Sequence, residues 1–232
     1  MAEGTHMVAT SYTLVIGDKN LSSWSLRPWI ALKAARIPFA EERVRLRQPD
    51  SKAEILRLSP SGKVPALKTE NGIVWDSLAI LEYLAEHHPE RRLWPQDAEQ
   101  RAAARSISAE MHSGFASLRN DMSMDLLARL PSPPMTDALE ADIRRIVAIW
   151  HDSRSRFGKS GPFLFGTFTN ADAMFAPVAT RFHTYGVDLS HFGDDGTAQA
   201  YAESILAMSE MTEWTEGAIA ETRNRQPEAG RQ

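Results

Sequence analysis

The chain has 232 residues, of which 43% are hydrophobic and 24% charged, and its formal net charge is −4. This length suffices for one large domain or two small ones, each with its own core. The small net charge creates no field of one sign that would attract nucleic acid or an anionic membrane, so we expect a small-molecule ligand.

The chain contains no apolar run of the ~18 to 20 residues that span a bilayer, and its N-terminus lacks the basic-then-apolar order of a secretory signal. We therefore expect a cytoplasmic protein with no membrane partner. The absence of cysteine excludes disulfides, thiolate metal sites and redox cycles on the protein's own thiol, so any sulfur chemistry must come from a ligand. The seven histidines show no recognisable ligand spacing, and we predict no metal site.

The first elements should form after a short leader. Residues 1–10 are expected to be a disordered leader, and MAEGTHM at its start reads like a cloning remnant. The β-branched and aromatic run 12–16 predicts a strand, and the polar residues 17–20 predict a loop. A helix should follow, because Pro28 suits a first helical turn and the apolar residues after it are mostly spaced as in a helix.

The next elements complete a small mixed fold. We predict a half-exposed strand over 43–46, a short helix over 51–58, a hairpin around Asn71-Gly72 and a helix over 78–88 capped by Ser77. The order βαβαββα is that of a thioredoxin-like α/β domain, with a mixed sheet and helices on both faces. We assign this domain to residues 11–88.

The composition changes after a short charged segment with two prolines, 89–96, which we predict to be a linker. Four later segments are rich in Ala, Leu, Met, Glu and Arg, with proline and glycine confined to the joints, and they predict an all-helical C-terminal domain over 97–220. These segments are 97–130, 136–157, 171–185 and 197–219. A polar, frayed tail is expected over 221–232.

The serines at the start of the first helix are the first candidate site. Ser22, Ser23 and Ser25 come where unpaired backbone N–H groups and the positive end of the helix dipole favour an anion, such as a thiolate. A serine hydroxyl can donate a hydrogen bond to sulfur and so lower the pKa of a thiol. The alternative is that Ser22 or Ser23 is only a helix N-cap, which is the commonest role of such a serine.

Four motifs together resemble the glutathione transferase superfamily, over nearly all of residues 10–220. They are SSWSLRPWIAL at 22–32, SPSGKVPAL at 59–67, WDSLAILEYLAE at 75–86 and TNADAMFAP at 169–177. The resemblance implies glutathione as co-substrate. It also implies that Val64 and Pro65 form a cis-proline turn that pairs with the cysteinyl part, that Asp76 and Ser77 bind the γ-glutamyl end, and that Lys63 meets the glycyl end.

Ser22-Ser23 followed by Ser25 and Arg27 is similar to the serine-type, zeta-like branch, nearest to its bacterial members. On that resemblance Ser22 is the leading thiol-activating residue and Ser23 the second candidate. Trp24 stands where the branch has cysteine, which bears on the maleylacetoacetate isomerase activity of zeta members rather than on glutathione binding. Arg27 either lies near the thiolate or forms an ion pair within the domain, and we favour the structural role.

The substrate pocket should include part of the first helix of the C-terminal domain. The spacing of Met111, Phe115 and Arg119 places them on one helix face, which usually belongs to the core. In the superfamily this helix also lines the pocket for the electrophile, so Trp24, Met111, His112 and Phe115 are candidates for it.

A capping box is predicted at the start of the later core helix. Thr169 and Asp172 have its spacing, with aspartate in place of the usual glutamate, and an apolar run follows. In the superfamily this element nucleates the core helix of the second domain. We therefore expect Asp172 to matter for folding and to lie far from the chemistry.

The predicted function is that of a glutathione transferase, in which a serine hydrogen bond activates the thiol for attack on a small electrophile. The alternatives are a non-catalytic glutathione-binding protein of transferase fold, a glutathione-dependent isomerase and a peroxidase. A thioltransferase or dehydroascorbate reductase would need a cysteine at the helix start. Members of the superfamily are typically dimers, so the resemblance also implies a homodimer.

Overall fold

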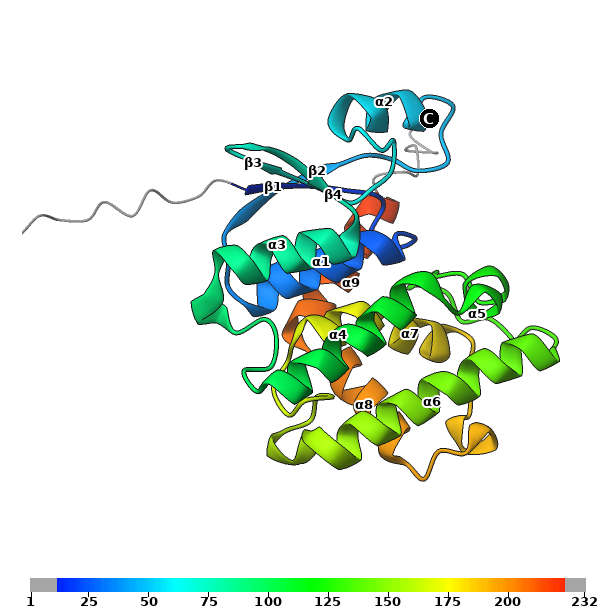
Figure 1. Cartoon of the computed structure of the whole chain (residues 1–232). Coiled ribbons are helices and arrows are strands. Elements are labelled where there is room, and N and C mark those ends of the chain that lie inside the picture. Colours follow the sequence, from blue (N-terminus) through cyan, green and yellow to red (C-terminus); the bar gives the residue numbers. More distant parts are fainter. Residues whose placement is uncertain (1–11, 224–232) are drawn as a thin grey trace, which may run out of the picture.

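The computed structural model describes residues 12–223. They form an α/β unit followed by a helical unit (Figure 1), so the predicted fold class is confirmed. The predicted leader, 1–10, lies outside the described residues. The elements of the first unit are β1 (Tyr12–Ile16), α1 (Ser23–Ala34), β2 (Phe39–Arg43), α2 (Ser51–Leu58), β3 (Ala66–Thr69), β4 (Gly72–Trp75) and α3 (Ser77–His87).

The four strands form one mixed sheet in the order β2-β1-β3-β4. Strand β1 pairs with β2 in parallel and with β3 antiparallel, and β3 and β4 form an antiparallel hairpin. Helices α1 and α3 lie on one side of the sheet and α2 on the other (Figure 1). Successive side chains of β1 point to opposite faces of the sheet. Leu14 therefore belongs to the main core, whereas Val15 packs with Ile55 of α2 in a second, smaller cluster.

The strand expected over 43–46 was placed too late in the sequence, because β2 is Phe39–Arg43. Its register against β1 pairs Tyr12 with Phe39 and Ile16 with Arg43. Beyond that point only the Val44 N–H continues the pairing, by donating to the Ile16 carbonyl, and the Leu46 N–H donates to the Asp18 carboxylate instead. Pairing with β1, rather than the charged-apolar alternation, therefore determines where the strand lies.

Six helices make up most of the second unit: α4 (Ala98–Ser113), α5 (Ala116–Asp121), α6 (Asp137–Phe157), α7 (Asn170–Thr184), α8 (Thr197–Leu206) and α9 (Ser209–Arg223). Three short 3-10 turns are η1 (Pro89–Arg91), η2 (Gly158–Ser160) and η3 (Leu189–Phe192). The helical segment expected over 97–130 is shorter than predicted, because α4 ends at Ser113 and α5 at Asp121.

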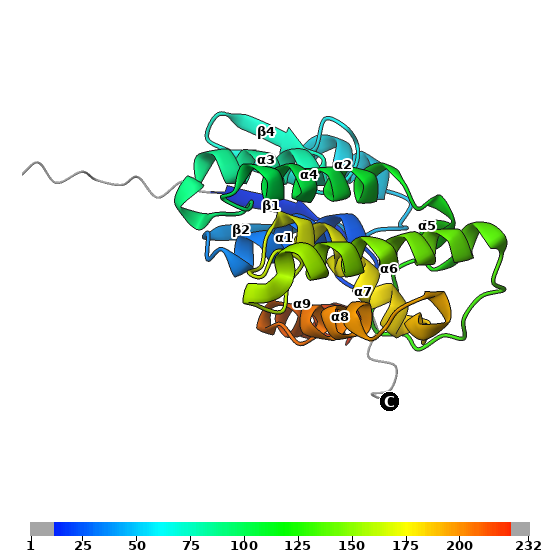
Figure 2. The same ribbon diagram turned by 60° about the horizontal axis from the view of Figure 1, so that its bottom comes forward.

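The two units share one hydrophobic core. Trp29 of α1, Leu81 of α3, Met174 of α7 and Trp214 of α9 are fully buried members of the same cluster. Helix α7 packs against α1, α4 and α8, and Figure 2 shows it within the molecule, between α6 and the α/β unit. The connection 89–96 is also packed, since Trp94 is buried and its indole N–H donates to Glu82. The two units are therefore packed against each other through this core.

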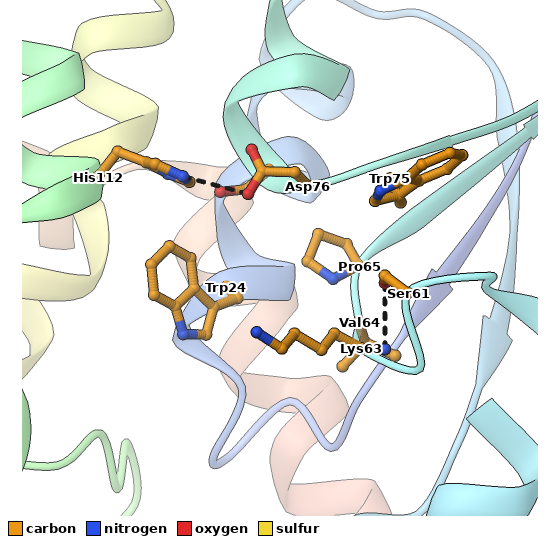
Figure 3. A pocket seen from close by; sticks show the side chains of 9 residues that line it. Trp24, Ser61, Lys63, Val64, Pro65, Trp75, Asp76 and His112 are labelled. Atoms are coloured by element: carbon orange, nitrogen blue, oxygen red, sulfur yellow. Dashed lines mark hydrogen bonds and ion pairs between the residues drawn. The ribbon is translucent and has the colours of Figure 1, made fainter. Parts of the chain in front are cut away.

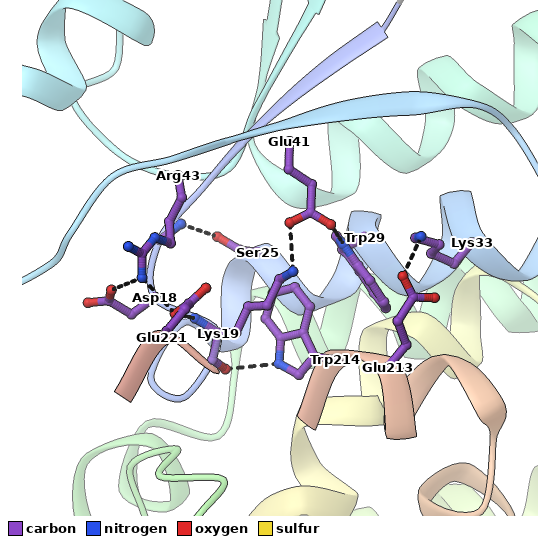
Figure 4. Close-up of polar contacts among 11 residues, drawn as sticks. Asp18, Lys19, Ser25, Trp29, Lys33, Glu41, Arg43, Glu213, Trp214 and Glu221 are labelled. Carbon is purple, nitrogen blue, oxygen red and sulfur yellow. Dashed lines mark hydrogen bonds and ion pairs between the residues drawn. The ribbon is translucent and has the colours of Figure 1, made fainter. Parts of the chain in front are cut away.

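Helix α9 returns to the α/β unit and is attached there by polar contacts (Figure 4). The Trp214 indole donates to the Lys19 carbonyl at 2.9 Å, and Glu221 Oε2 accepts from the Lys19 N–H at 3.0 Å and lies 3.2 Å from Arg43 Nη1. The expected polar tail therefore begins too early: residues 221–223 belong to α9, because Glu221 is held by partners on the first unit. Residues 224–232 lie outside the described part of the chain.

The predicted capping box opens α7. Asp172 Oδ2 accepts from the Thr169 N–H at 2.8 Å, and Asp172 Oδ1 accepts from the Leu164 N–H at 3.0 Å. Asp172 is fully buried. Within residues 12–223 no helix is long and apolar enough to cross a membrane.

Candidate active site

A cavity of about 570 Å³ opens between the two units (Figure 3). Eight of its lining residues come from the α/β unit, and His112 comes from α4 of the helical unit. The volume lies in the range typical of small-molecule sites. The lining residues are Trp24, Ser61, Lys63, Val64, Pro65, Trp75, Asp76, Ser77 and His112.

The loop before β3 forms one wall of the cavity. The Val64–Pro65 peptide bond is cis, as the resemblance implied. Within residues 12–223 no hydrogen bond uses the backbone N–H or C=O of Val64. Lys63 is exposed, its N–H donates to Ser61 Oγ at 3.2 Å, and its side chain extends toward Trp24 (Figure 3). This wall thus presents an unpaired backbone step and a cation to the cavity.

The start of α3 forms the facing polar wall. Asp76, not Ser77, is the N-cap, which corrects the sequence-based prediction. Asp76 adopts φ of 77°, and its Oδ1 accepts from the Leu78 and Ala79 N–H groups at 2.9 and 3.3 Å. Because Asp76 caps the helix, Ser77 is released from that role. Ser77 is 1% exposed, and its Oγ has no hydrogen-bond partner among the described residues.

His112 reaches from α4 to this wall. Its Nε2 lies 3.1 Å from Asp76 Oδ2, and its ring packs edge-on against Trp24 with centroids 5.4 Å apart. Burial lowers the pKa of His112, the nearby Arg27 and Arg119 lower it further, and Asp76 opposes them. The neutral imidazole is therefore favoured, and its Nε2 faces the Asp76 carboxylate.

Ser22 and Ser23 are buried at the start of α1 and do not line the cavity as Trp24 does. Ser22 is the N-cap: its Oγ accepts from the Ser25 N–H at 3.3 Å and its hydroxyl donates to Ser25 Oγ at 2.8 Å. Ser23 Oγ accepts a hydrogen bond from Arg181 Nη2 of α7 at 3.2 Å. The two serines thus face different partners.

Arg27 is not in an ion pair, which corrects the structural role favoured from the sequence. Within residues 12–223 no carboxylate lies within 4 Å of its guanidinium nitrogens, and Nη1 and Nη2 have no hydrogen-bond partner, although Nε donates to the Met174 carbonyl at 3.2 Å. Its Cζ lies 4.3 Å from the centroid of the Trp24 ring, and that of Arg119 lies 4.7 Å from it. Trp24 therefore contacts both cations, of which Arg27 is fully buried and Arg119 is half-buried.

Met111 and Phe115 do not line the cavity, contrary to the prediction. Met111 is fully buried in the core, and Phe115 is 7% exposed. The predicted stripe assumed one continuous helix, but α4 ends at Ser113 and Phe115 has φ of 61°. The change of chain direction places Phe115 and Arg119 on a separate turn and helix.

Ser61 and Trp75, which also line the cavity, and Arg181, which contacts Ser23, were not predicted from the sequence. Ser61 belongs to the loop motif at 59–67 and Trp75 directly precedes Asp76, so the motifs could have identified both as lining residues. The sequence offered no such signal for Arg181, because only the packing of α7 on α1 brings it to Ser23. In the described part of the chain no three His, Asp or Glu side chains are grouped so as to hold a metal ion.

Part of the chain is similar to known proteins. The glutathione S-transferase N-terminal domain model matches residues 21–87. The probable maleylacetoacetate isomerase of Caenorhabditis elegans is 37% identical over 46% of this chain and 50% of that protein. For maleylacetoacetate isomerase of Rattus norvegicus the identity is 32% over 60% of this chain and 62% of that protein. A zeta-class glutathione S-transferase of Euphorbia esula is 31% identical over 48% and 50%.

Solved structures share the fold across most of the chain. A glutathione transferase homologue from Burkholderia BGR1, solved with bound glutathione, has a TM-score of 0.69 at 22% identity and covers 90% of this chain and 99% of that one. An omega 3C transferase from Trametes versicolor has a TM-score of 0.66 at 19% identity, with 88% of each chain covered. The chain spans about half to three fifths of the length of the curated relatives named above. Residues 21–87 thus match a glutathione S-transferase N-terminal domain, and about half of the chain is similar to zeta-class transferases and maleylacetoacetate isomerases.

Proposed function

We propose that the protein binds glutathione in the cavity between its two units and activates the thiol for attack on a small electrophile. The observation that carries this proposal is the environment of the Ser77 hydroxyl. Its hydroxyl is buried at the start of an 11-residue helix, lines the cavity and has no partner among the described residues. A buried polar group without a partner costs about 1 to 3 kcal/mol, so a ligand acceptor at this place would remove a penalty.

The γ-glutamyl carboxylate is such an acceptor. A helix N-terminus favours negative charge, and the Ser77 hydroxyl would add a charge-assisted hydrogen bond. Asp76 lies beside it with a carboxylate that can pair with the γ-glutamyl ammonium, and its orientation is held by the Leu78 N–H and by His112. The cavity thus offers the donors and acceptors that the zwitterionic end of glutathione requires.

The rest of the peptide fits along the loop before β3. The unpaired N–H and C=O of Val64, next to the cis Pro65, suit the backbone of the cysteinyl residue. Lys63 supplies a cation for the glycyl carboxylate. This arrangement directs the cysteinyl side chain toward the start of α1.

The chemistry follows from the start of α1. A serine of this first turn, Ser22 or Ser23, donates to the sulfur and favours the thiolate, which then attacks carbon. Glutathione supplies the nucleophile, and the protein supplies position and electrostatics. Conjugation and glutathione-dependent isomerisation share this step, and relatives bearing the isomerase name support the second. We also propose a cytoplasmic homodimer, in keeping with the superfamily.

The test is a panel of small electrophiles assayed with glutathione and the full-length protein. We expect glutathione-dependent product formation with at least one electrophile, and at least a tenfold lower rate when the activating serine is replaced by alanine. The control is Ser190→Ala, an exposed serine of η3 in the helical unit. Equal rates for wild type, Ser22→Ala and Ser23→Ala would contradict the serine mechanism.

A second candidate is a protein that binds glutathione without activating it. It is favoured by the burial of both serines, at 5% and 6% exposed, and by their absence from the cavity lining. Thiolate absorbance of bound glutathione near neutral pH separates the two candidates. Binding without thiolate formation would favour the non-catalytic protein.

A further inference from the structure

Two lysine side chains flank Gly62 at the edge of the cavity. Lys63 lines the cavity, as does Ser61 on the other side of Gly62. Lys52 belongs to α2, and its Nζ donates to the Gly62 carbonyl at 3.1 Å. Both lysines are exposed. The loop before β3 thus brings together two ammonium groups from different elements, and that of Lys52 takes no part in the proposed glutathione site.

The position of the Lys52 ammonium depends on glycine at position 62. Gly62 adopts φ of 62°, and a Cβ atom there would lie 2.5 Å from Lys52 Nζ and 3.0 Å from Leu56 Cδ2. Lys52 and Leu56 lie four residues apart, on the face of α2 that meets this loop. Because glycine has no side chain, α2 approaches the loop closely and the Lys52 ammonium stays beside the Gly62 carbonyl.

Neither ammonium is neutralised by a neighbouring side chain. Lys19, Lys33 and Lys68 each form an ion pair with a glutamate, whereas no carboxylate oxygen in residues 12–223 lies within 4 Å of the nitrogen of Lys52 or Lys63. In the same part of the chain the Gly62 carbonyl is the only hydrogen-bond acceptor of Lys52. An ammonium group has three donors, so Lys52 can still donate to a ligand.

The surrounding sequence adds positive charge. Residues 45–63 contain five cationic and two acidic residues, although the whole chain has a net charge of −4. Within the described residues none of the five cations is in an ion pair. They are Arg45, Arg47, Lys52, Arg57 and Lys63. A local excess of unpaired charge attracts anions, most strongly at low ionic strength, so this edge of the cavity favours a ligand with more than one negative group.

We propose that Lys52 and Lys63 form a paired carboxylate site, and that the thiol peptides bound by this protein include γ-glutamyl-cysteinyl peptides whose third residue carries a second carboxylate. This inference rests on the glutathione binding proposed above. Glutathione ends in glycine and offers one carboxylate there, which Lys63 receives. Glutamate in place of that glycine offers two, so its main-chain carboxylate meets Lys63 and its side-chain carboxylate meets Lys52.

The test compares, by calorimetry, the binding of γ-glutamyl-cysteinyl-glutamate and γ-glutamyl-cysteinyl-glutamine, two peptides of nearly the same shape that differ by one charge. We expect wild type to bind the glutamate peptide about three to five times more tightly at low ionic strength, as for an exposed ion pair. The ratio of the two Kd values should approach one as salt is added.

Variants of Lys52 test the assignment. Lys52→Met should bring the ratio to about one at low ionic strength, whereas Lys52→Arg, which keeps the charge, should preserve it. The control is Arg36→Gln, which removes the same charge from an exposed residue beyond the C-terminal end of α1, away from the start of that helix, where Trp24 lines the cavity. The control should preserve the ratio. Circular dichroism checks that the variants fold.

The remaining outcomes separate this inference from the proposed function. Equal affinities of wild type for the two peptides would overturn the inference, as would a wild type that binds glutathione but neither peptide. A ratio that Lys52→Met leaves unchanged, or that Arg36→Gln also abolishes, would overturn it too. In each of these cases glutathione binding would stand. A wild-type protein that binds neither glutathione nor the peptides would overturn the proposed function itself.

Discussion

His112 Nε2 lies 3.1 Å from Asp76 Oδ2, so one contact across the cavity connects the helical unit to the start of α3. The Oδ1 atom of Asp76 caps that helix at the same time. Asp76 is therefore oriented from two sides before any ligand arrives. Preorganisation of this kind reduces the entropy that a ligand must overcome when it binds.

The first prediction concerns pH and His112. Its pKa is lowered in the folded protein, chiefly by burial, so the unfolded chain binds the proton more readily. Stability should therefore fall as pH falls from about 7 to about 5, through the window below the ordinary histidine pKa. His112→Gln, whose side chain does not titrate, should lose this component. The measurement is the free energy of unfolding in urea for both proteins across that range, and a difference that stays constant with pH would contradict it.

The second prediction concerns the capping box. Asp172→Ala removes the acceptor of the Leu164 and Thr169 N–H groups in a fully buried place, so it should destabilise the protein by about 1 to 2 kcal/mol or more. Glutathione affinity of the folded protein should not change, because Asp172 does not line the cavity. Urea unfolding and calorimetry measure the two quantities. A loss of affinity at normal stability would refute the structural role.

The third prediction uses the titration of the same residue. Burial raises the pKa of Asp172 to about 6, against the hydrogen bonds from Leu164 and Thr169 that lower it. The folded state then holds this proton more tightly than the unfolded chain, so its contribution to stability should fall as pH rises from about 4 to about 6. The unfolding free energy of wild type relative to Asp172→Asn should decrease over that window. A relative free energy that increases or stays flat would show that the carboxylate is ionised throughout.

The fourth prediction concerns the attachment of α9. Trp214 is fully buried, its ring centroid lies 5.0 Å from that of Trp29, and its indole donates to the Lys19 carbonyl (Figure 4). Trp214→Phe should destabilise the protein by about 1 to 3 kcal/mol, because it loses that hydrogen bond and part of the packing. The control is Lys33→Ala, which removes a more exposed ion pair with Glu213 and should cost less than about 1 kcal/mol. Equal costs in urea unfolding would argue against a specific role for Trp214.

The sequence was informative where local chemistry decides the structure. The hairpin around Asn71-Gly72, the apolar run of β1 and the Thr169–Asp172 box each carry their own signal, and all three are present, with Glu70 and Asn71 as the two turn residues. The β2 boundary was missed because a strand ends where its partner ends, and Ile16 of β1 sets that limit. The break before Phe115 was missed because residues 97–130 have a helical composition throughout.

The site was predictable only in part. Motif positions indicated that Val64, Asp76 and Ser77 should lie together, and they line one cavity. Asp76 rather than Ser77 is the cap because Asp76 has a backbone φ of 77°, and this angle cannot be inferred from the residue types. The meeting of Arg181 with Ser23 joins residues 158 positions apart, so only the packing of α7 on α1 reveals it.

The most direct test of glutathione binding is calorimetric titration of glutathione into wild type and Ser77→Ala. Loss of a hydrogen bond to a carboxylate is worth about 1.5 to 3 kcal/mol, so the Kd should rise at least about tenfold in Ser77→Ala. The free energy of unfolding without ligand should not decrease, because Asp76 is the cap and the substitution removes a buried hydroxyl that has no partner among the described residues. Equal affinities in the two proteins, or no binding by wild type, would contradict the account.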